Sequence, residues 1–203
     1  MPDLSLETEL RAEGYQIVAG IDEAGRGPLA GPVSVAAVVL PNDFSHGVLT
    51  DSKQLSEKKR EILYEELTND SAISWNSVLI DEKVIDRINI LQSTWKGMGD
   101  AFTGLVPQAD IALIDGKPVK NFSGEHRAVV KGDSKSLSIA AASIIAKVER
   151  DRLMLQYARE FPEYGFERHK GYGTKLHLEA LHKHGPCPIH RTSFEPVARL
   201  IPE

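Results

Sequence analysis

Apolar and polar positions along the chain follow two periods, which together predict a mixed α/β fold. Runs of apolar and β-branched residues bounded by turn residues predict strands, and apolar residues spaced three or four apart predict helices. The predicted strands are residues 15–22, 32–40, 71–80, 109–115 and 127–133. The predicted helices are residues 56–70, 88–105, 137–161 and 174–185. The first strands form a hairpin-like set and the later ones alternate with helices, which is typical of a sheet with helices on its faces.

The pattern contains no linker-like break, repeat or low-complexity segment. We therefore expect a single domain over residues 1–203, with a core at about 15–161 and a helical C-terminal extension at about 162–203.

Composition narrows the setting in which the protein works. No apolar run approaches the roughly 18 residues that a membrane span needs. The acidic start of the chain lacks the basic and apolar regions of a signal peptide. Cys187 is the single cysteine, so no internal disulfide can form and we expect a structural role for it. These features predict a soluble, cytoplasmic protein with no membrane partner.

Positive charge is concentrated near the C-terminus of a chain whose net charge is −5. Five of the seven histidines lie between His169 and His190. The lysines and arginines among them are Arg168, Lys170, Lys175, Lys183 and Arg191. Such a run is most often a solvated helix face, and it could also be a basic patch for nucleic acid.

Carboxylates stand where three of the predicted strands stop. Asp22 and Glu23 end the first, Asp115 ends the fourth and Asp133 ends the fifth. If the first and fourth strands are neighbours, these acids meet at one edge of the sheet. Clustered carboxylates raise one another's pKa unless a cation joins them, and Mg²⁺ or Mn²⁺ prefers such oxygen ligands. Two such ions could support phosphodiester cleavage. Each acid alone is more typical of an ordinary turn.

A glycine-rich loop follows the first pair of acids directly. Gly25 and Gly27 allow the backbone to approach a ligand closely, and Arg26 between them offers a cationic fork. A loop of this kind beside a metal-binding carboxylate pair suits a substrate that carries phosphate, although a Gly-Arg-Gly triplet also occurs in plain turns.

Several longer strings make the chain similar to one known family. These are GIDEAGRGPLAGPVSVAAVVL, TDSKQLS, NILQSTWKGM, LIDG, KGDSKSLSIAAASIIAKVERDRLM, HKGYGTKLHLEAL and GPCPIHRTSFEPV. In this order, from about residue 16 to residue 198, they resemble bacterial ribonuclease HII. The resemblance implies a ribonuclease H-like fold, a mixed five-stranded sheet flanked by helices with a helical C-terminal extension.

The resemblance also implies an activity and a site. The family cleaves RNA in RNA–DNA hybrids and cuts 5′ of ribonucleotides embedded in duplex DNA, leaving 3′-hydroxyl and 5′-phosphate ends, a step in ribonucleotide removal. Its four catalytic, Mn²⁺- or Mg²⁺-binding acids fall on Asp22, Glu23, Asp115 and Asp133.

Substrate recognition in the family falls on two further segments. Its 2′-hydroxyl-reading loop corresponds to Gly25, Arg26 and Gly27, and its junction tyrosine corresponds to Tyr172. Without this resemblance, Tyr172 would be taken for a packing aromatic residue.

Further residues are predicted to contact the phosphates of the substrate. They are Lys53, Ser143, Lys147, Lys170, Lys175, His190 and Arg191. Ser143 and Lys147 are one helical turn apart and so share a face. For Ser143 a packing role, and for Lys53 a solvated surface position, are nearly equal alternatives.

The two ends of the sequence lead to predictions about partners. The short N-terminal segment leaves no room for the substrate-binding domain of ribonuclease HIII, and the ending IPE predicts no clamp-binding tail. We expect a monomer. Two alternatives remain at this point: a nucleic-acid-binding protein without catalysis, and a two-metal DNA nuclease of the same superfold. Retention of all four acids argues against the first, and the ribose-sensing residues argue against the second.

Overall fold

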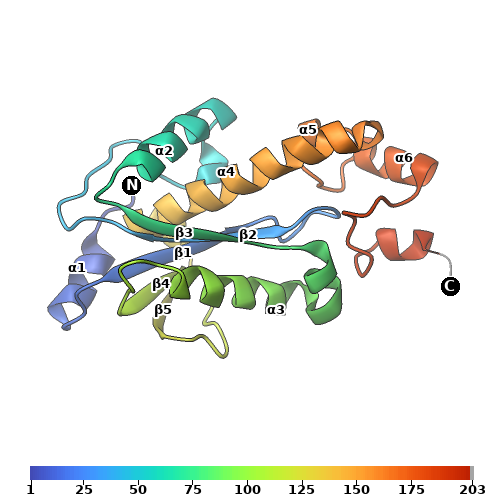
Figure 1. The fold of residues 1–203 in the computed structure, drawn as a ribbon. Coiled ribbons are helices and arrows are strands. Elements are labelled where there is room, and N and C mark those ends of the chain that lie inside the picture. The colour runs from blue at the N-terminus through green and yellow to red at the C-terminus, as the bar shows by residue number, and fades with distance from the viewer. Residues whose placement is uncertain (202–203) are drawn as a thin grey trace.

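A mixed five-stranded sheet forms the centre of the molecule, which the computed structural model describes over residues 1–201 (Figure 1). The strands are β1 (Val18–Ala24), β2 (Val33–Val39), β3 (Ser74–Ile80), β4 (Ile111–Asp115) and β5 (Glu125–Val129). They lie in the order β3-β2-β1-β4-β5. The β1–β2 and β2–β3 pairs are antiparallel, whereas β1–β4 and β4–β5 are parallel. The predicted fold class is confirmed, including the adjacency of the first and fourth strands.

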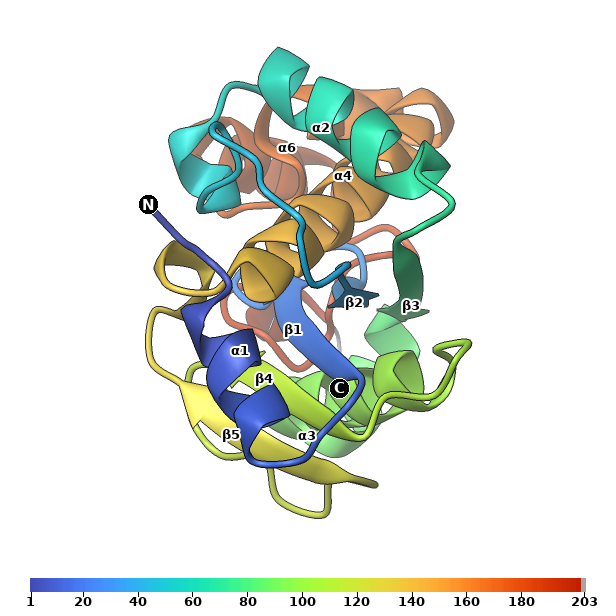
Figure 2. The same cartoon turned by 90° about the vertical axis from the view of Figure 1, so that its left-hand side faces the viewer.

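Helices cover both faces of this sheet. They are α1 (Ser5–Ala12), α2 (Glu57–Asn69), α3 (Glu82–Thr103), α4 (Leu137–Glu160), α5 (Phe166–His169) and α6 (Lys175–His184). In Figure 1, α4 and α2 lie above the sheet and α3 lies below it; Figure 2 shows the same layers end-on. The central strands are apolar on both sides because each face packs against a helix. None of the helices in residues 1–201 is long and apolar enough to cross a membrane.

Helix α4 is packed unusually close to the strand that carries the first acids. A Cβ placed on Gly20 of β1 would lie 2.2 Å from the backbone carbon of Ser138. The facing turns of α4 consist of small residues, and Ala140, Ala141 and Ala142 are fully buried. These small side chains allow the backbone of α4 to approach β1, which places Ser143 beside the site.

Residues 162–201 pack around the C-terminal end of α4, beyond the ends of the strands (Figure 1). Tyr164, Phe166 and Ile189 form an apolar cluster there with Met154 of α4 and Ala30 of the β1–β2 loop. Ala30 also pairs with His190 in an isolated β-bridge. The C-terminal segment is thereby fastened directly to the loop that contains the Gly-Arg-Gly triplet.

Several predicted boundaries are wrong. Strand β1 continues through Glu23 to Ala24, because Glu23 remains paired with Val35 of β2. Strand β5 ends at Val129, and Asp133 instead lies in a short 3₁₀ helix, Gly132–Ser134. Helix α3 begins six residues earlier than residue 88, with a break in its helical geometry at Asn89. Helix α1 was not predicted, although its Glu7 is buried against the N-terminus of α4.

Candidate active site

The register between β1 and β4 brings Asp22 and Asp115 together. Ile21 of β1 pairs with Ile114 of β4 in a parallel ladder, and Asp22 and Asp115 are the next residues on their strands. Residues in register on neighbouring strands face the same side of a sheet. Ile21 and Ile114 belong to the core cluster on the α3 side of the sheet. Because successive residues of a strand face opposite sides, Asp22 and Asp115 face the side that α4 covers. Asp22 is 5 % exposed and therefore lies almost completely below the surface.

The other two acids approach from different directions. Glu23 follows Asp22 in the strand and so points to the opposite, α3 side, where Thr94 and Trp95 line a pocket of about 690 Å³ with it. Asp133 is delivered by the turn before α4. That turn is tied to β4 because the backbone N–H of Gly132 donates to Asp115 Oδ1 at 2.6 Å.

The charges of the four acids are mutually unfavourable. Burial, followed by the negative charges of Glu23 and Asp115, raises the pKa of Asp22 well above its usual value. Burial likewise raises the pKa of Glu23, opposed by Arg26, whose Nη1 lies 3.2 Å from Glu23 Oε1. The pKa of Asp133 is raised by burial and by the charges of Asp51 and Asp115. The fold thus holds the carboxylates together although their charges repel one another, and a bound cation would offset this electrostatic repulsion.

The donor set fits a hard divalent cation, and three of its four side chains already have a protein partner. Across residues 1–201, no three His, Cys, Asp or Glu side chains are close enough to form a metal site by themselves. Asp22 Oδ1 accepts from the Glu23 backbone N–H at 2.7 Å, and Asp115 and Glu23 have the partners given above. All four residues offer carboxylate oxygens, the ligands preferred by Mg²⁺ and Mn²⁺.

Lys53 faces this acid cluster from the loop before α2. Burial acts to lower the pKa of its ammonium group, but the charges of four carboxylates outweigh burial and raise it. Those carboxylates belong to Asp22, Asp51, Asp133 and Asp115. Asp51 was not singled out from the sequence. Its place in the string TDSKQLS, two residues before Lys53, was the available signal.

A second pocket, of about 190 Å³, brings together most of the predicted substrate-binding residues. Its lining comprises Glu23, Ala24, Gly25, Arg26, Gly27, Ser52, Lys53, Ser143, Lys147 and Tyr172. Tyr172 is 44 % exposed, and its Cε1 atom would lie 3.8 Å from a Cβ placed on Gly27. The tyrosine ring therefore stands across from the glycine loop, with Glu23 of the acid cluster at the same pocket.

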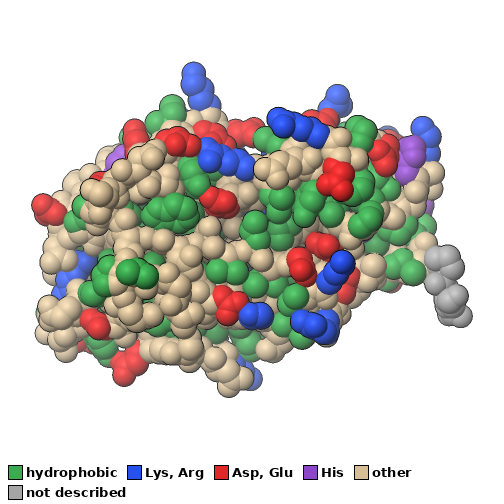
Figure 3. Space-filling view, viewed as in Figure 1, with side chains coloured by type: hydrophobic (Ala, Val, Ile, Leu, Met, Phe, Trp, Pro, Cys, Tyr) green, Lys and Arg blue, Asp and Glu red, His purple; other side chains and the backbone are tan. Residues whose placement is uncertain are grey.

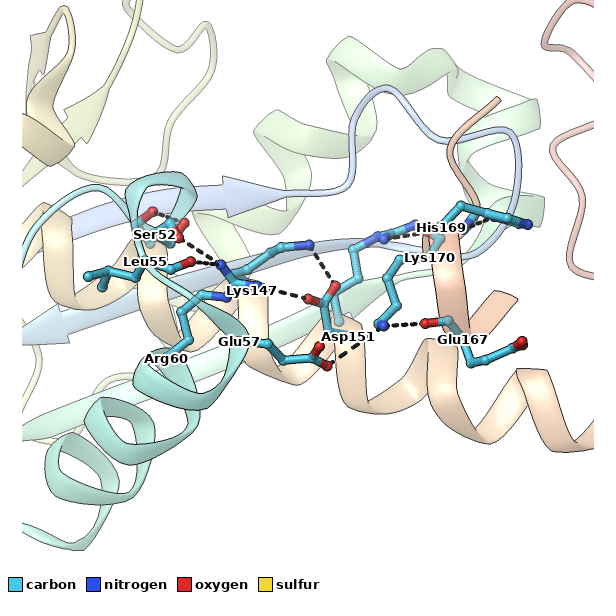
Figure 4. A network of polar contacts seen from close by, with 12 residues as sticks. Ser52, Leu55, Glu57, Arg60, Lys147, Asp151, Glu167, His169 and Lys170 are labelled. Carbon is cyan, nitrogen blue, oxygen red and sulfur yellow. Dashed lines mark hydrogen bonds and ion pairs between the residues drawn. The ribbon is translucent and has the colours of Figure 1, made fainter. Parts of the chain in front are cut away.

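Ser143 and Lys147 line the α4 wall of this pocket. Ser143 is buried, and its Oγ lies 2.9 Å from Oγ of Ser52, which the sequence analysis did not identify. Lys147 Nζ pairs with Asp151 Oδ1 at 2.7 Å, one turn further along α4 (Figure 4). Burial lowers the pKa of Lys147, with the charge of Asp151 opposing.

The C-terminal basic residues are arranged differently from the prediction. Arg191 and His190 are almost completely buried, at 0 % and 1 % exposed, so the prediction that they contact phosphate is wrong. Lys170 Nζ donates to the Glu167 carbonyl at 2.7 Å and lies 3.7 Å from Glu57 Oε1 (Figure 4). Lys175 is exposed at the start of α6. On the face shown in Figure 3, positive and negative side chains are interspersed, and no continuous basic field covers it.

Three of the histidines form a buried chain that supports the Tyr172 segment. His177 Nδ1 donates to the Tyr172 carbonyl at 2.9 Å, so its Nε2 must accept from His190 Nε2 at 3.0 Å. His190 Nδ1 in turn accepts from the backbone N–H of Cys187 at 2.9 Å. His169 stacks on the His177 ring with centroids 4.5 Å apart. The two accepting nitrogens, His177 Nε2 and His190 Nδ1, are available only while both rings are neutral.

We predict that His177 and His190 stay neutral well into the acid range. Burial lowers the pKa of each to about 4. The unfolded chain binds these protons near pH 6.5, so it holds more protons than the folded chain between about pH 6.5 and 4. The stability that these residues contribute is therefore lost as the pH falls through that window.

NMR titration of the imidazole signals checks this prediction, with His177→Gln and His190→Gln used for assignment. The two signals should keep the shifts of neutral imidazole until the pH nears 4. Protonation of either ring near pH 6.5 would contradict the buried neutral chain.

The fold and the site together define a ribonuclease H-type nuclease. A five-stranded mixed sheet places carboxylates of β1 and β4 side by side, next to a pocket lined by a glycine loop and an exposed tyrosine. The family model described as Ribonuclease HII matches residues 19–197. The chain belongs to the ribonuclease HII family, and it is an endonuclease with ribonuclease H activity on RNA–DNA hybrids.

Two relatives in this family match over nearly their whole length. Ribonuclease HII of Endomicrobium trichonymphae is 54% identical over 198 residues, covering 97% of this chain and 94% of the relative. Ribonuclease HII of Caldicellulosiruptor bescii is 50% identical over 189 residues, covering 93% of this chain and 91% of the relative.

Solved structures share the fold. Ribonuclease H2 from Pyrococcus horikoshii superimposes with a TM-score of 0.77 at 27% identity, covering 91% of this chain and 97% of that one. Ribonuclease HII of Archaeoglobus fulgidus, solved in complex with PCNA, gives a TM-score of 0.73 at 26% identity, covering 89% and 96%.

Proposed function

We propose that the protein cuts 5′ of ribonucleotides embedded in duplex DNA, in addition to cleaving the RNA strand of hybrids, and leaves 3′-hydroxyl and 5′-phosphate ends. The observation that carries this proposal is the pocket shared by Glu23, the Gly25-Arg26-Gly27 loop and Tyr172. It puts a backbone loop and an exposed ring, suited to a ribose and a neighbouring deoxyribose, directly beside the acids. Ribonucleotide removal from DNA is the process that such an activity serves.

Asp22, Glu23, Asp115 and Asp133 would hold Mg²⁺ or Mn²⁺ in this proposal. When bound, a divalent cation lowers the pKa of an attacking water and stabilises the departing 3′-oxygen. The raised pKa of Asp22, Glu23 and Asp133 supports the assignment, because buried neighbouring carboxylates favour a cation between them.

The two recognition elements select a ribose followed by a deoxyribose. A 2′-hydroxyl both donates and accepts hydrogen bonds, and backbone groups of residues 25–27 can supply partners for it. Tyr172 faces the loop from across the pocket, where its ring would pack on the following sugar and disfavour a second 2′-oxygen. Together the two elements would favour an RNA–DNA junction over uniform RNA or DNA.

Phosphate contacts would come from the residues around the two pockets. Lys53 lies near four carboxylates, so its ammonium group would bridge between the acids and a substrate phosphate. Ser143 and Lys147 lie on the same pocket wall, and we propose that they also face the substrate backbone. Lys170 and Lys175 would add nonspecific affinity from the C-terminal segment.

Partners beyond nucleic acid remain predictions. We propose that the protein acts as a monomer. The ending on which the clamp prediction depends includes residues 202–203, which lie outside the described part of the chain.

Incubation of an RNA–DNA hybrid with the enzyme in Mg²⁺, Mn²⁺ or EDTA tests metal dependence. An all-DNA duplex and an all-RNA duplex of the same sequence serve as controls. We expect the RNA strand of the hybrid to be cut with either metal, no cleavage in EDTA, and intact control duplexes. Cleavage that persists in EDTA, or cleavage of the all-DNA duplex at a similar rate, would overturn the proposal.

A further inference from the structure

Two buried arginines donate hydrogen bonds to the backbone of the loop between β1 and β2 from the interior of the protein. Arg191 donates to the carbonyls of Gly25, Arg26 and Gly31 at 2.6, 2.9 and 2.9 Å. Arg150 of α4 donates to the carbonyls of Ala30, Pro32 and Lys170 at 3.0, 2.9 and 2.9 Å. Five of these six acceptors belong to the loop at residues 25–32, and the sixth lies two residues before Tyr172.

These guanidinium groups have no carboxylate partner among residues 1–201. Both arginines are 0 % exposed, and neither forms an ion pair in the described part of the chain. Burial lowers the pKa of Arg150 to about 10, and burial together with the charge of Arg150 lowers that of Arg191 to about 9. Both therefore remain cations at neutral pH. Carbonyl oxygens accept all of their hydrogen bonds, and the Arg191 guanidinium also lies 5.1 Å from the centroid of the Phe194 ring.

Burial of two cations destabilises the folded state, because each loses its hydration. Two like charges out of water cost several kcal/mol each, and apolar residues of similar size often stabilise a core better. Packing alone therefore does not account for a pair of buried cations at this position. What the pair achieves is to turn a series of loop carbonyls toward the protein.

The opposite side of the loop is left open toward the pocket. Within residues 1–201, the backbone N–H groups of Arg26 and Gly27 donate no hydrogen bond to another protein group, and both residues are exposed. Inward carbonyls and unpaired N–H groups at adjacent, exposed residues suit recognition of an oxygen on a sugar.

The first glycine of the loop is shaped by the same arginines. Gly25 has a φ of +93°, which L-residues with a side chain rarely adopt. A Cβ there would also lie 2.0 Å from Nε of Arg150. The Gly-Arg-Gly triplet and the buried pair are therefore parts of one construction.

We propose that Arg150 and Arg191 are positioning residues for ribose recognition. Arg191 fixes the carbonyls of Gly25 and Arg26 inward. Arg150 fixes the end of the same loop at Ala30 and Pro32, and through the Lys170 carbonyl it couples the loop to the segment that carries Tyr172. The inference rests on the proposed reading of the 2′-hydroxyl by this loop. Neither arginine touches the substrate; each acts through the backbone that it orients.

Arg191→Lys and Arg150→Lys test the proposal, because lysine keeps the charge and loses the planar three-way donation. Arg152→Lys is the matched control, since Arg152 lies on the same helix and pairs with Glu61 and Glu65 at the surface. The readout is the ratio of affinities for a duplex with one ribonucleotide and for the same all-DNA duplex. It is measured in EDTA, below the melting temperature of each variant.

The wild type and Arg152→Lys should prefer the ribonucleotide duplex by roughly tenfold, the size expected for hydrogen bonds to one hydroxyl. Arg191→Lys and Arg150→Lys should bring the ratio close to one while all-DNA binding stays within about twofold. If one variant does not fold, the other decides the result.

Three outcomes are distinguishable. A wild type that binds both duplexes equally contradicts the proposed function itself. A wild type that discriminates, with folded lysine variants that discriminate as well, overturns only the positioning role. Equal loss of affinity for both duplexes also overturns it, because that result indicates general support of the fold.

Discussion

Replacing Asp22 with Asn is expected to abolish cleavage and, at the same time, to raise thermal stability. Asn keeps the shape of the side chain but removes the negative charge beside Asp115 that the proposed metal site requires. We expect the cleavage rate to fall by at least about 10³-fold. Binding to a hybrid should change little, since the recognition loop and Tyr172 are untouched.

The gain in stability follows from the direction of the Asp22 pKa shift. A pKa raised by burial and by neighbouring carboxylates means that the folded state disfavours the ionised form. The folded protein therefore holds more protons than the unfolded chain above the ordinary carboxyl pKa, and its stability rises as the pH falls. The neutral Asn variant should exceed the wild type in melting temperature at pH 7, by a margin that shrinks at lower pH.

Melting curves in EDTA, single-turnover cleavage and hybrid binding measure the three effects. Asp43→Asn is the matched control, because Asp43 is exposed in the loop after β2 and makes no contact with the acid cluster. It should behave as the wild type does. Cleavage by Asp22→Asn at a normal rate would contradict the catalytic assignment, and a lower melting temperature would contradict the electrostatic account.

Replacing Tyr172 with Ala should reduce cleavage at a single ribonucleotide far more than cleavage of a long hybrid. Stacking of a base on an aromatic side chain contributes about 1–3 kcal/mol, and we expect a loss of similar order, roughly 5- to 150-fold, when the ring that packs on the sugar is removed. In a long hybrid the enzyme has many positions at which to cut, and few of them depend on a following deoxyribose. The ratio of the two rates is therefore the informative quantity.

Tyr172→Phe separates the ring from the hydroxyl. Within residues 1–201 the Tyr172 hydroxyl makes no hydrogen bond to the protein, so Phe should keep most of the junction preference. Equal losses on both substrates in Tyr172→Ala, or a Phe variant as defective as the Ala variant, would remove the proposed packing role of the ring.

Periodicity predicted the sheet because its strands are short, apolar and bounded by turn residues. It could not predict where β1 stops. Asp22 and Glu23 predicted the end of the strand, since charged residues seldom continue a buried strand. In the structure β1 continues to Ala24, because β2 remains paired with it. Asp133 was placed at a strand end for the same reason, and the structure reaches the site with it through a turn instead.

The strand-end pattern singled out the four acids and the glycine loop, whereas the role of Tyr172 came only from the family resemblance. Asp22 and Asp115 are 93 residues apart, and only the parallel pairing of β1 and β4 makes them neighbours. Arg191 and His190 show the limit of this reasoning. A cationic or titratable residue is expected at the surface, because most such residues are exposed. Burial of Arg191 depends on partners that are distant in the sequence, the carbonyls of Gly25 and Arg26, and the sequence does not reveal them.

The most direct test of this account is cleavage of a DNA duplex that contains one ribonucleotide, with the product ends mapped. The substrate is incubated with Mg²⁺, Mn²⁺ or EDTA beside the all-DNA duplex. We predict a metal-dependent cut on the 5′ side of the ribonucleotide, with 3′-hydroxyl and 5′-phosphate ends and an intact control. A cut on the 3′ side, cleavage of the control, or binding without any cut would contradict it.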